Sequence, residues 1–89
     1  MKHKWTENDD IAGLYLYLYK ENMLDKKIEN ISDKLGMSLS SLKMKISNFK
    51  SIAKGKGLDH ASAQSVEVYK NYCGLNKIEF AKLVNNIIK

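Results

Sequence analysis

The stretch that decides the fold is IENISDKLGMSLSSLKMKISNFK, residues 28–50, which predicts two helices joined by a tight turn. Helical spacing relates the apolar residues on both sides of the turn: Ile28, Ile31 and Leu35, then Leu39, Leu42, Ile46 and Phe49. Between the two sets, Gly36 can adopt a positive φ at a helix C-terminus, and Ser38 or Ser40 can cap the next helix. A short helix, a glycine turn and a longer helix form the layout of a helix-turn-helix.

The outward face of the second of these helices carries hydroxyl and ammonium groups, which in DNA complexes bind phosphates and base edges. Together with the basic loop that follows, the candidate DNA-binding residues are Ser40, Ser41, Lys43, Met44, Lys45, Ser47, Lys50, Lys54 and Lys56. The alternative is the solvated face of an ordinary helical bundle. We favour DNA binding because the pattern and the charge agree.

The net charge of +5 is concentrated on this same region. Residues 34–58 contain six Lys and no acid, whereas residues 1–33 contain five Lys against seven acids and residues 59–89 contain four Lys against three acids. Double-stranded DNA is the favoured partner over a membrane, because the apolar face of the basic helix is needed for the core. All 15 basic residues are Lys, so we expect salt-dependent affinity and little of the guanine recognition typical of Arg.

The segment before the central stretch predicts a helix over 7–22, capped by Thr6 and acidic in its first turn. Its run LYLYLY, residues 14–19, alternates like a strand, but the cap and the helical apolar stripe favour a helix. Two roles are open for the tyrosines of this run, packing in the core or contact with a partner: Tyr15, Tyr17 and Tyr19.

The complete pattern predicts a single all-α domain, a bundle of about five helices over 7–22, 26–35, 40–53, 63–72 and 77–88. We expect no β-wing, because no pair of alternating strands follows the basic helix. The last helix is more apolar than one face requires. Either its second face pairs with another copy through Phe80, Leu83 and Ile87, giving a homodimer, or the fold uses both faces for its own core.

No catalytic constellation is evident, so we expect no enzyme, no metal and no cofactor. His3 and His60 are far apart, and neither has a Cys or a second His at ligand spacing. Cys73 is the only cysteine, which excludes an internal disulfide and fits a buried thiol in a reducing compartment. Because no segment reaches 18 apolar residues and no secretory signal is present, we expect a cytoplasmic protein without a membrane span.

Several of these segments together resemble the small helical domain at the N-terminus of HNH-type restriction endonucleases and related bacterial and phage proteins. The similarity spans about residues 5–73, after a basic lead at 1–5, and leaves an additional helix within 74–89. Its fragments are WTE at 5–7, LYLYLY at 14–19, ISDKLG at 31–36, SSLKMKISNF at 40–49, GLDHAS at 57–62 and VY at 68–69. The resemblance implies a helix-turn-helix DNA-binding module without the nuclease that follows in that family. Asn48 belongs to the match and either bonds DNA or helps to end its helix; we favour the second role.

The expected function is DNA binding by a small transcriptional regulator of a phage or mobile element, with the helix at about 40–53 in the major groove. A dimer would read two half-sites about one helical turn apart. The alternative is a protein-binding inhibitor or adaptor, such as a phage-encoded antagonist of a host nuclease. A third interpretation is an RNA-binding helical module, which needs exposed aromatic side chains beside the Lys patch.

Overall fold

The computed structural model describes residues 5–55 and 62–89, and these form five helices without a strand. The helices are α1 (Glu7–Tyr19), α2 (Ile28–Leu35), α3 (Leu39–Ala53), α4 (Ala63–Tyr72) and α5 (Lys77–Ile87). The all-α prediction is therefore confirmed. No strand that could belong to a β-wing occurs in the described part of the chain.

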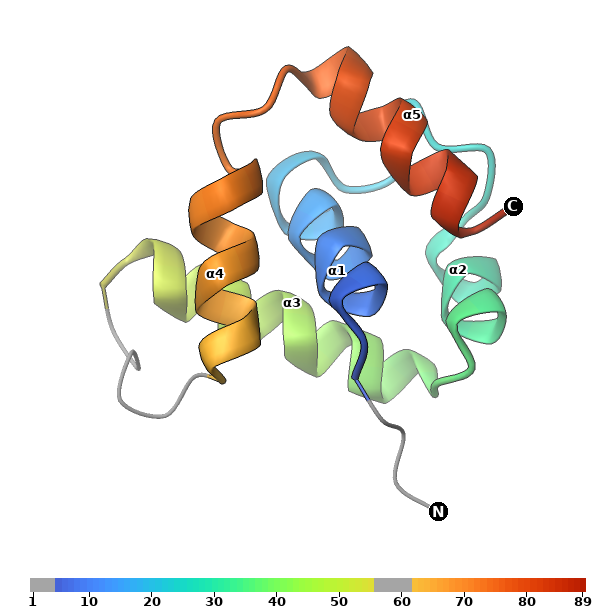
Figure 1. The fold of residues 1–89 in the computed structure, drawn as a ribbon. Helices are drawn as coiled ribbons and strands as arrows, with labels where there is room; N and C mark the ends of the chain where they lie inside the picture. Colours follow the sequence, from blue (N-terminus) through green and yellow to red (C-terminus); the bar gives the residue numbers. More distant parts are fainter. Residues whose placement is uncertain (1–4, 56–61) are drawn as a thin grey trace.

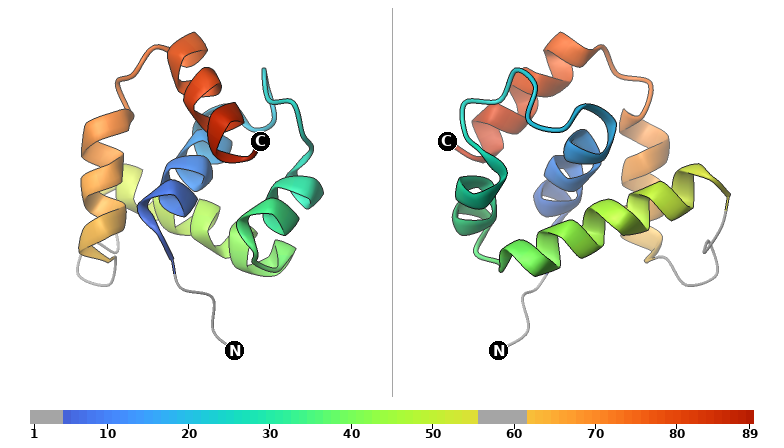
Figure 2. Two further views of the ribbon diagram at one scale, coloured as in Figure 1. Left: turned by 45° about the vertical axis from the view of Figure 1, so that its right-hand side comes forward. Right: turned by 180° about the vertical axis from the view of Figure 1, so that it is seen from behind.

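The helix α1 lies at the centre of the bundle, where it packs against α3, α4 and α5 (Figure 1). The longest helix, α3, runs along one side of the molecule from α2 to α4, and its outer side faces away from α1 (Figure 2, right). The domain is flattened, with principal extents of 35 × 33 × 17 Å. This arrangement leaves one long side of α3 uncovered by any other helix.

The first helix begins at a reciprocal capping box. The Thr6 hydroxyl accepts a hydrogen bond from the backbone N–H of Asp9, and the Asp9 carboxylate accepts one from the backbone N–H of Thr6. The run at residues 14–19 is helical, as predicted, and its side chains account for much of the core. The helix ends earlier than predicted, since Lys20 follows Tyr19 with a φ of 57°.

The turn between α2 and α3 has the predicted form. Gly36 adopts a left-handed conformation with a φ of 77°, and the N–H of Met37 donates to the carbonyl of Ser32 at 3.0 Å. The Ser38 hydroxyl then accepts a hydrogen bond from the N–H of Ser41 at 3.1 Å and caps α3. Three residues, 36–38, thus separate the two helices.

The residues of α5 that were candidates for a dimer interface pack against the core of their own chain. Phe80 is fully buried and meets Tyr15 edge to face, with 5.1 Å between the ring centroids. The prediction that Phe80 lies at a dimer interface is wrong, because its ring belongs to the core of its own chain. Leu83 and Ile87 are partly buried and pack against the same core.

A candidate nucleic-acid interface on the third helix

Most of the predicted DNA-binding residues share the outer face of α3. Ser40, Lys43, Met44, Ser47, Lys50 and Lys54 are exposed, whereas Ser41 is partly buried. Intervals of three, four and seven residues relate the exposed set, so these side chains form neighbouring rows along one side of the helix. No acidic residue occurs in α3 itself. Lys56 lies outside the described residues.

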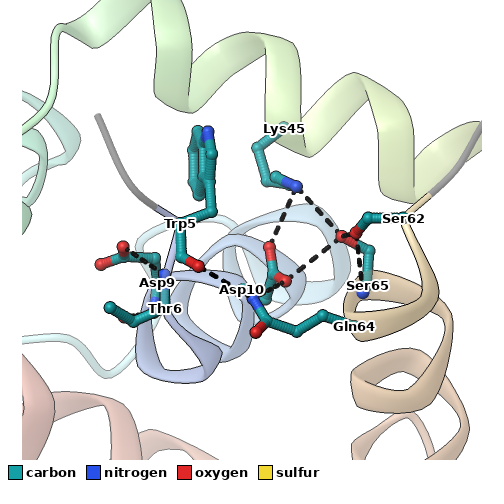
Figure 3. Close-up of polar contacts among 8 residues, drawn as sticks. All are labelled: Trp5, Thr6, Asp9, Asp10, Lys45, Ser62, Gln64 and Ser65. Carbon is teal, nitrogen blue, oxygen red and sulfur yellow. Dashed lines mark hydrogen bonds and ion pairs between the residues drawn. The ribbon is translucent and has the colours of Figure 1, made fainter. Parts of the chain in front are cut away.

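Lys45 does not belong to this face, and its predicted contact with DNA is wrong. It is only 8% exposed, and its ammonium group lies 3.1 Å from the Asp10 carboxylate and 3.0 Å from the Ser65 hydroxyl (Figure 3). The same ammonium group stands 4.5 Å from the centre of the Trp5 ring, a distance suited to a cation–π contact. The charge of Lys45 is thus used inside the molecule.

A polar cluster with a buried centre surrounds this ion pair and joins three helices (Figure 3). Asp10 of α1 is fully buried, and its Oδ2 accepts hydrogen bonds from Gln64 Nε2 at 2.8 Å and from Ser65 Oγ at 3.2 Å. Ser62 Oγ lies 2.9 Å from Ser65 Oγ and extends the cluster to the N-cap of α4. Because these groups come from α1, α3 and α4, the cluster fixes how α3 is oriented on the bundle.

The contact between Lys45 and Ser65 resembles the serine–lysine pair of some hydrolases. In such a pair, a neutral amine accepts the proton of the serine. Here the Lys45 ammonium ion is paired with Asp10, and Ser65 is only 2% exposed, which leaves no room for a substrate at its hydroxyl. We therefore interpret the cluster as a structural connection.

The sequence contained a signal for the burial of Lys45. Leu42, Lys45, Phe49 and Ile52 follow one another at intervals of three, four and three residues, and all four are buried. A lysine within an apolar row predicts a buried partner of opposite charge. Asp10 is that partner, but nothing in the local pattern distinguishes it from the neighbouring acids that cap α1.

The packing of α3 on α1 is close at Gly13. A Cβ atom at this position would lie 3.1 Å from Cγ of Lys45 and 3.5 Å from Cε2 of Phe49. This distance is tighter than most Cβ contacts, so a side chain at position 13 would require the stem of Lys45 to shift by a few tenths of an ångström. Gly13 therefore helps to set the distance at which the central helix supports α3.

Asn48 does not end the third helix. The helix continues for five residues beyond it, to Ala53, and the Asn48 side chain is exposed. The expectation that Asn48 terminates α3 by bonding the backbone is therefore wrong. Its position one turn after Met44 places both side chains along the same side of the helix.

The tyrosines of α1 are mostly turned inward. Tyr15 is fully buried, and its hydroxyl donates a hydrogen bond to the backbone carbonyl of Asn22. Burial raises the pKa of Tyr15, and the neighbouring Tyr19 raises it further. Tyr17 and Tyr19 are partly buried, and Lys77 stands over the Tyr19 ring at 5.3 Å. Of the two roles left open for Tyr15, the structure therefore shows packing in the core.

A mainly apolar groove lies beside the basic face, between α1, α2 and α3. Its volume is about 320 Å³. The lining residues are Leu16, Tyr17, Lys20, Glu21, Ile28 and Ile46. Its apolar walls could accommodate a side chain of a protein partner.

The chain matches no protein-family model, no curated protein and no solved structure. Across residues 5–55 and 62–89, no three His, Cys, Asp or Glu side chains gather where they could hold a metal ion. Within the same ranges, every helix is too short or too polar to cross a bilayer.

Proposed function

We propose that this protein binds double-stranded DNA by placing α3 in the major groove. One observation carries the proposal: α3 presents an uncovered face that has Lys and Ser side chains but no acid. An α-helix has the diameter that the major groove admits. The short turn at Gly36 and the buried cluster around Lys45 hold this helix at the edge of the domain.

The exposed lysines of α3 are spaced so that they can contact one phosphate strand along the groove. Lys43, Lys50 and Lys54 are separated by seven and four residues, so they form a single row that can follow a phosphate strand. Ser40 and Ser47 lie beside this row and can bond phosphates or base edges. Contacts to about three phosphates give a salt slope of about −2.7, equivalent to about 40-fold weaker binding between 50 and 200 mM salt.

A regulator of transcription encoded by a phage or mobile element is the biological role that we propose for this DNA-binding unit. A homodimer would place two copies of α3 on half-sites about one helical turn apart. Leu83 and Ile87 are the remaining candidates for that contact, since Phe80 is used within the chain.

Fluorescence anisotropy with a labelled mixed-sequence duplex tests the proposal. We expect binding that weakens steeply when the salt concentration is raised from 50 to 200 mM. Light scattering on the same sample gives the oligomeric state. If no duplex binds even at the lower salt concentration, the proposed function is wrong.

The groove beside α3 supports a second candidate function, that of a protein-binding inhibitor or adaptor. Its walls from Leu16, Tyr17 and Ile28 are typical of a site for an apolar side chain. A nuclease-treated pull-down should then recover a stoichiometric host protein, and Tyr17→Ala should reduce its recovery. Recovery that depends on intact nucleic acid would instead favour DNA binding.

A further inference from the structure

Two exposed side chains on α3 are not explained by phosphate binding. Met44 is 66% exposed, although a long apolar side chain gains nothing from contact with water. Asn48 follows one turn later and is also exposed, in the interior of the helix, where Asn is a poor helix former. Both lie beside the row of Ser40 and Ser47, on the side away from Lys43 and Lys50.

The chemistry of this pair matches the two bases of an A·T pair. Thymine presents a methyl group in the major groove, which forms contacts with apolar side chains. Adenine presents N7 as an acceptor and the N6 amino group as a donor, and the Asn side-chain amide can bond both. Guanine is most often read by Arg or Lys, but the chain has no Arg, and the exposed Lys residues of α3 form a separate row.

We propose that Met44 and Asn48 make α3 a reader of A·T base pairs, with Met44 against a thymine methyl group and Asn48 on adenine N7 and N6. This inference rests on the proposed DNA binding. Four residues of helix rise about 6 Å, and neighbouring base pairs are about 3.4 Å apart, so the two side chains reach base pairs one or two steps from each other. The DNA sequence that α3 recognises should therefore contain the thymine and the adenine within a short A·T-rich segment.

The experiment begins with selection from a randomised duplex library, followed by titration of the selected duplex with the whole protein. Single thymines are then replaced by deoxyuridine, which lacks only the methyl group, and single adenines by 7-deazaadenine, which lacks the N7 acceptor. The variants are Met44→Ala and Asn48→Ala. Matched controls are Met23→Ala and Asn86→Ala, which change exposed residues outside α3.

We expect an A·T-rich consensus with one thymine at which deoxyuridine weakens wild-type binding about three- to fourfold, as expected for one methyl group. At one adenine, the 7-deaza analogue should weaken binding by up to the roughly 5- to 150-fold of a bidentate contact. Met44→Ala should remove the sensitivity to deoxyuridine, and Asn48→Ala should remove the sensitivity to 7-deazaadenine. The two control variants should keep both sensitivities. Circular dichroism confirms that the variants are folded.

The outcomes separate the two proposals. If wild-type protein binds no duplex at low salt, the proposed function is wrong and this inference fails with it. If it binds DNA but selects G·C-rich sites, or if neither base analogue changes its affinity, the DNA-binding face stands and the A·T reader is refuted. The A·T reader is also refuted if Met44→Ala and Asn48→Ala keep the full sensitivity to both analogues.

Discussion

Removing the positive charge of Lys45 should strongly destabilise the domain. Lys45→Met keeps an apolar stem of similar length but leaves the Asp10 carboxylate fully buried without its cation. Breaking a buried pair in this way costs about 3–5 kcal/mol. The free energy of unfolding expected for a domain of this length is about 4–13 kcal/mol, so the loss is a large fraction of the total.

A matched control and a double variant separate the loss of the ion pair from the loss of a lysine as such. Lys43→Met changes an exposed lysine two residues away and should alter stability by no more than about 0.5 kcal/mol. Asp10→Asn combined with Lys45→Met removes both charges and keeps an oxygen that can accept from Gln64 and Ser65. We expect it to be at least about 2 kcal/mol more stable than Lys45→Met alone.

Urea unfolding followed by tryptophan fluorescence is the assay, because Trp5 is the only tryptophan and lies against Lys45. The urea midpoint of Lys45→Met should fall by at least about 1 M. The folded double variant should bind DNA as wild type does. If Lys45→Met is as stable as Lys43→Met, or if the folded double variant loses DNA affinity as a Lys43 variant does, the buried role of Lys45 is refuted.

Three further predictions concern the fold and its pH dependence. Gly13→Leu should destabilise the domain by about 1–3 kcal/mol in urea unfolding, because the leucine side chain would meet the stem of Lys45. This loss should exceed the gain from the better helix propensity of leucine. An unchanged urea midpoint would contradict the close packing of α1 on α3. Gly36→Ala should cost about 1–2 kcal/mol in the same assay, because Gly36 has a φ of 77°, and a neutral or stabilising effect would argue against that turn. The pKa of Tyr15 is raised in the folded state, chiefly by burial, so its protonated form contributes stability that is fully present below pH 10 and is lost as the pH rises above 10. Unfolding measured between pH 8 and 11 should show a smaller alkaline loss for Tyr15→Phe than for wild type, and equal losses would exclude Tyr15 as a cause.

Much of the fold follows from local patterns in the sequence. The predicted start of α1 at Glu7 and both ends of α4 are confirmed, and α3 begins one residue before the predicted start. Capping residues and apolar spacing act between residues only a few positions apart, so these signals can be read from the sequence without knowledge of the tertiary fold. The end of α1 differs from the prediction because Lys20 leaves the helix with a positive φ. The residue at this position is neither glycine nor asparagine, the types that usually indicate a positive φ.

The errors at the candidate site have a different physical origin. Whether Lys45 faces solvent depends on Asp10 and Ser65, which belong to other helices and are distant in the sequence. Whether Phe80 is covered depends equally on Tyr15. Charge patterning identified the basic helix, and the apolar row of Leu42, Phe49 and Ile52 indicates that Lys45 faces inward. Only the tertiary contacts identify Asp10 as its partner.

The most direct test of DNA binding by α3 is the salt dependence of duplex affinity for a charge-matched pair of double variants. Lys43→Ala with Lys50→Ala removes two charges from the exposed face, and Lys27→Ala with Lys82→Ala removes two exposed charges elsewhere. We expect the first variant to bind all duplexes more weakly, with a salt slope about two units shallower than that of wild type, and the second to retain nearly the full slope. Equal slopes for the two variants, or a larger loss for the second, would contradict the placement of α3 in the groove.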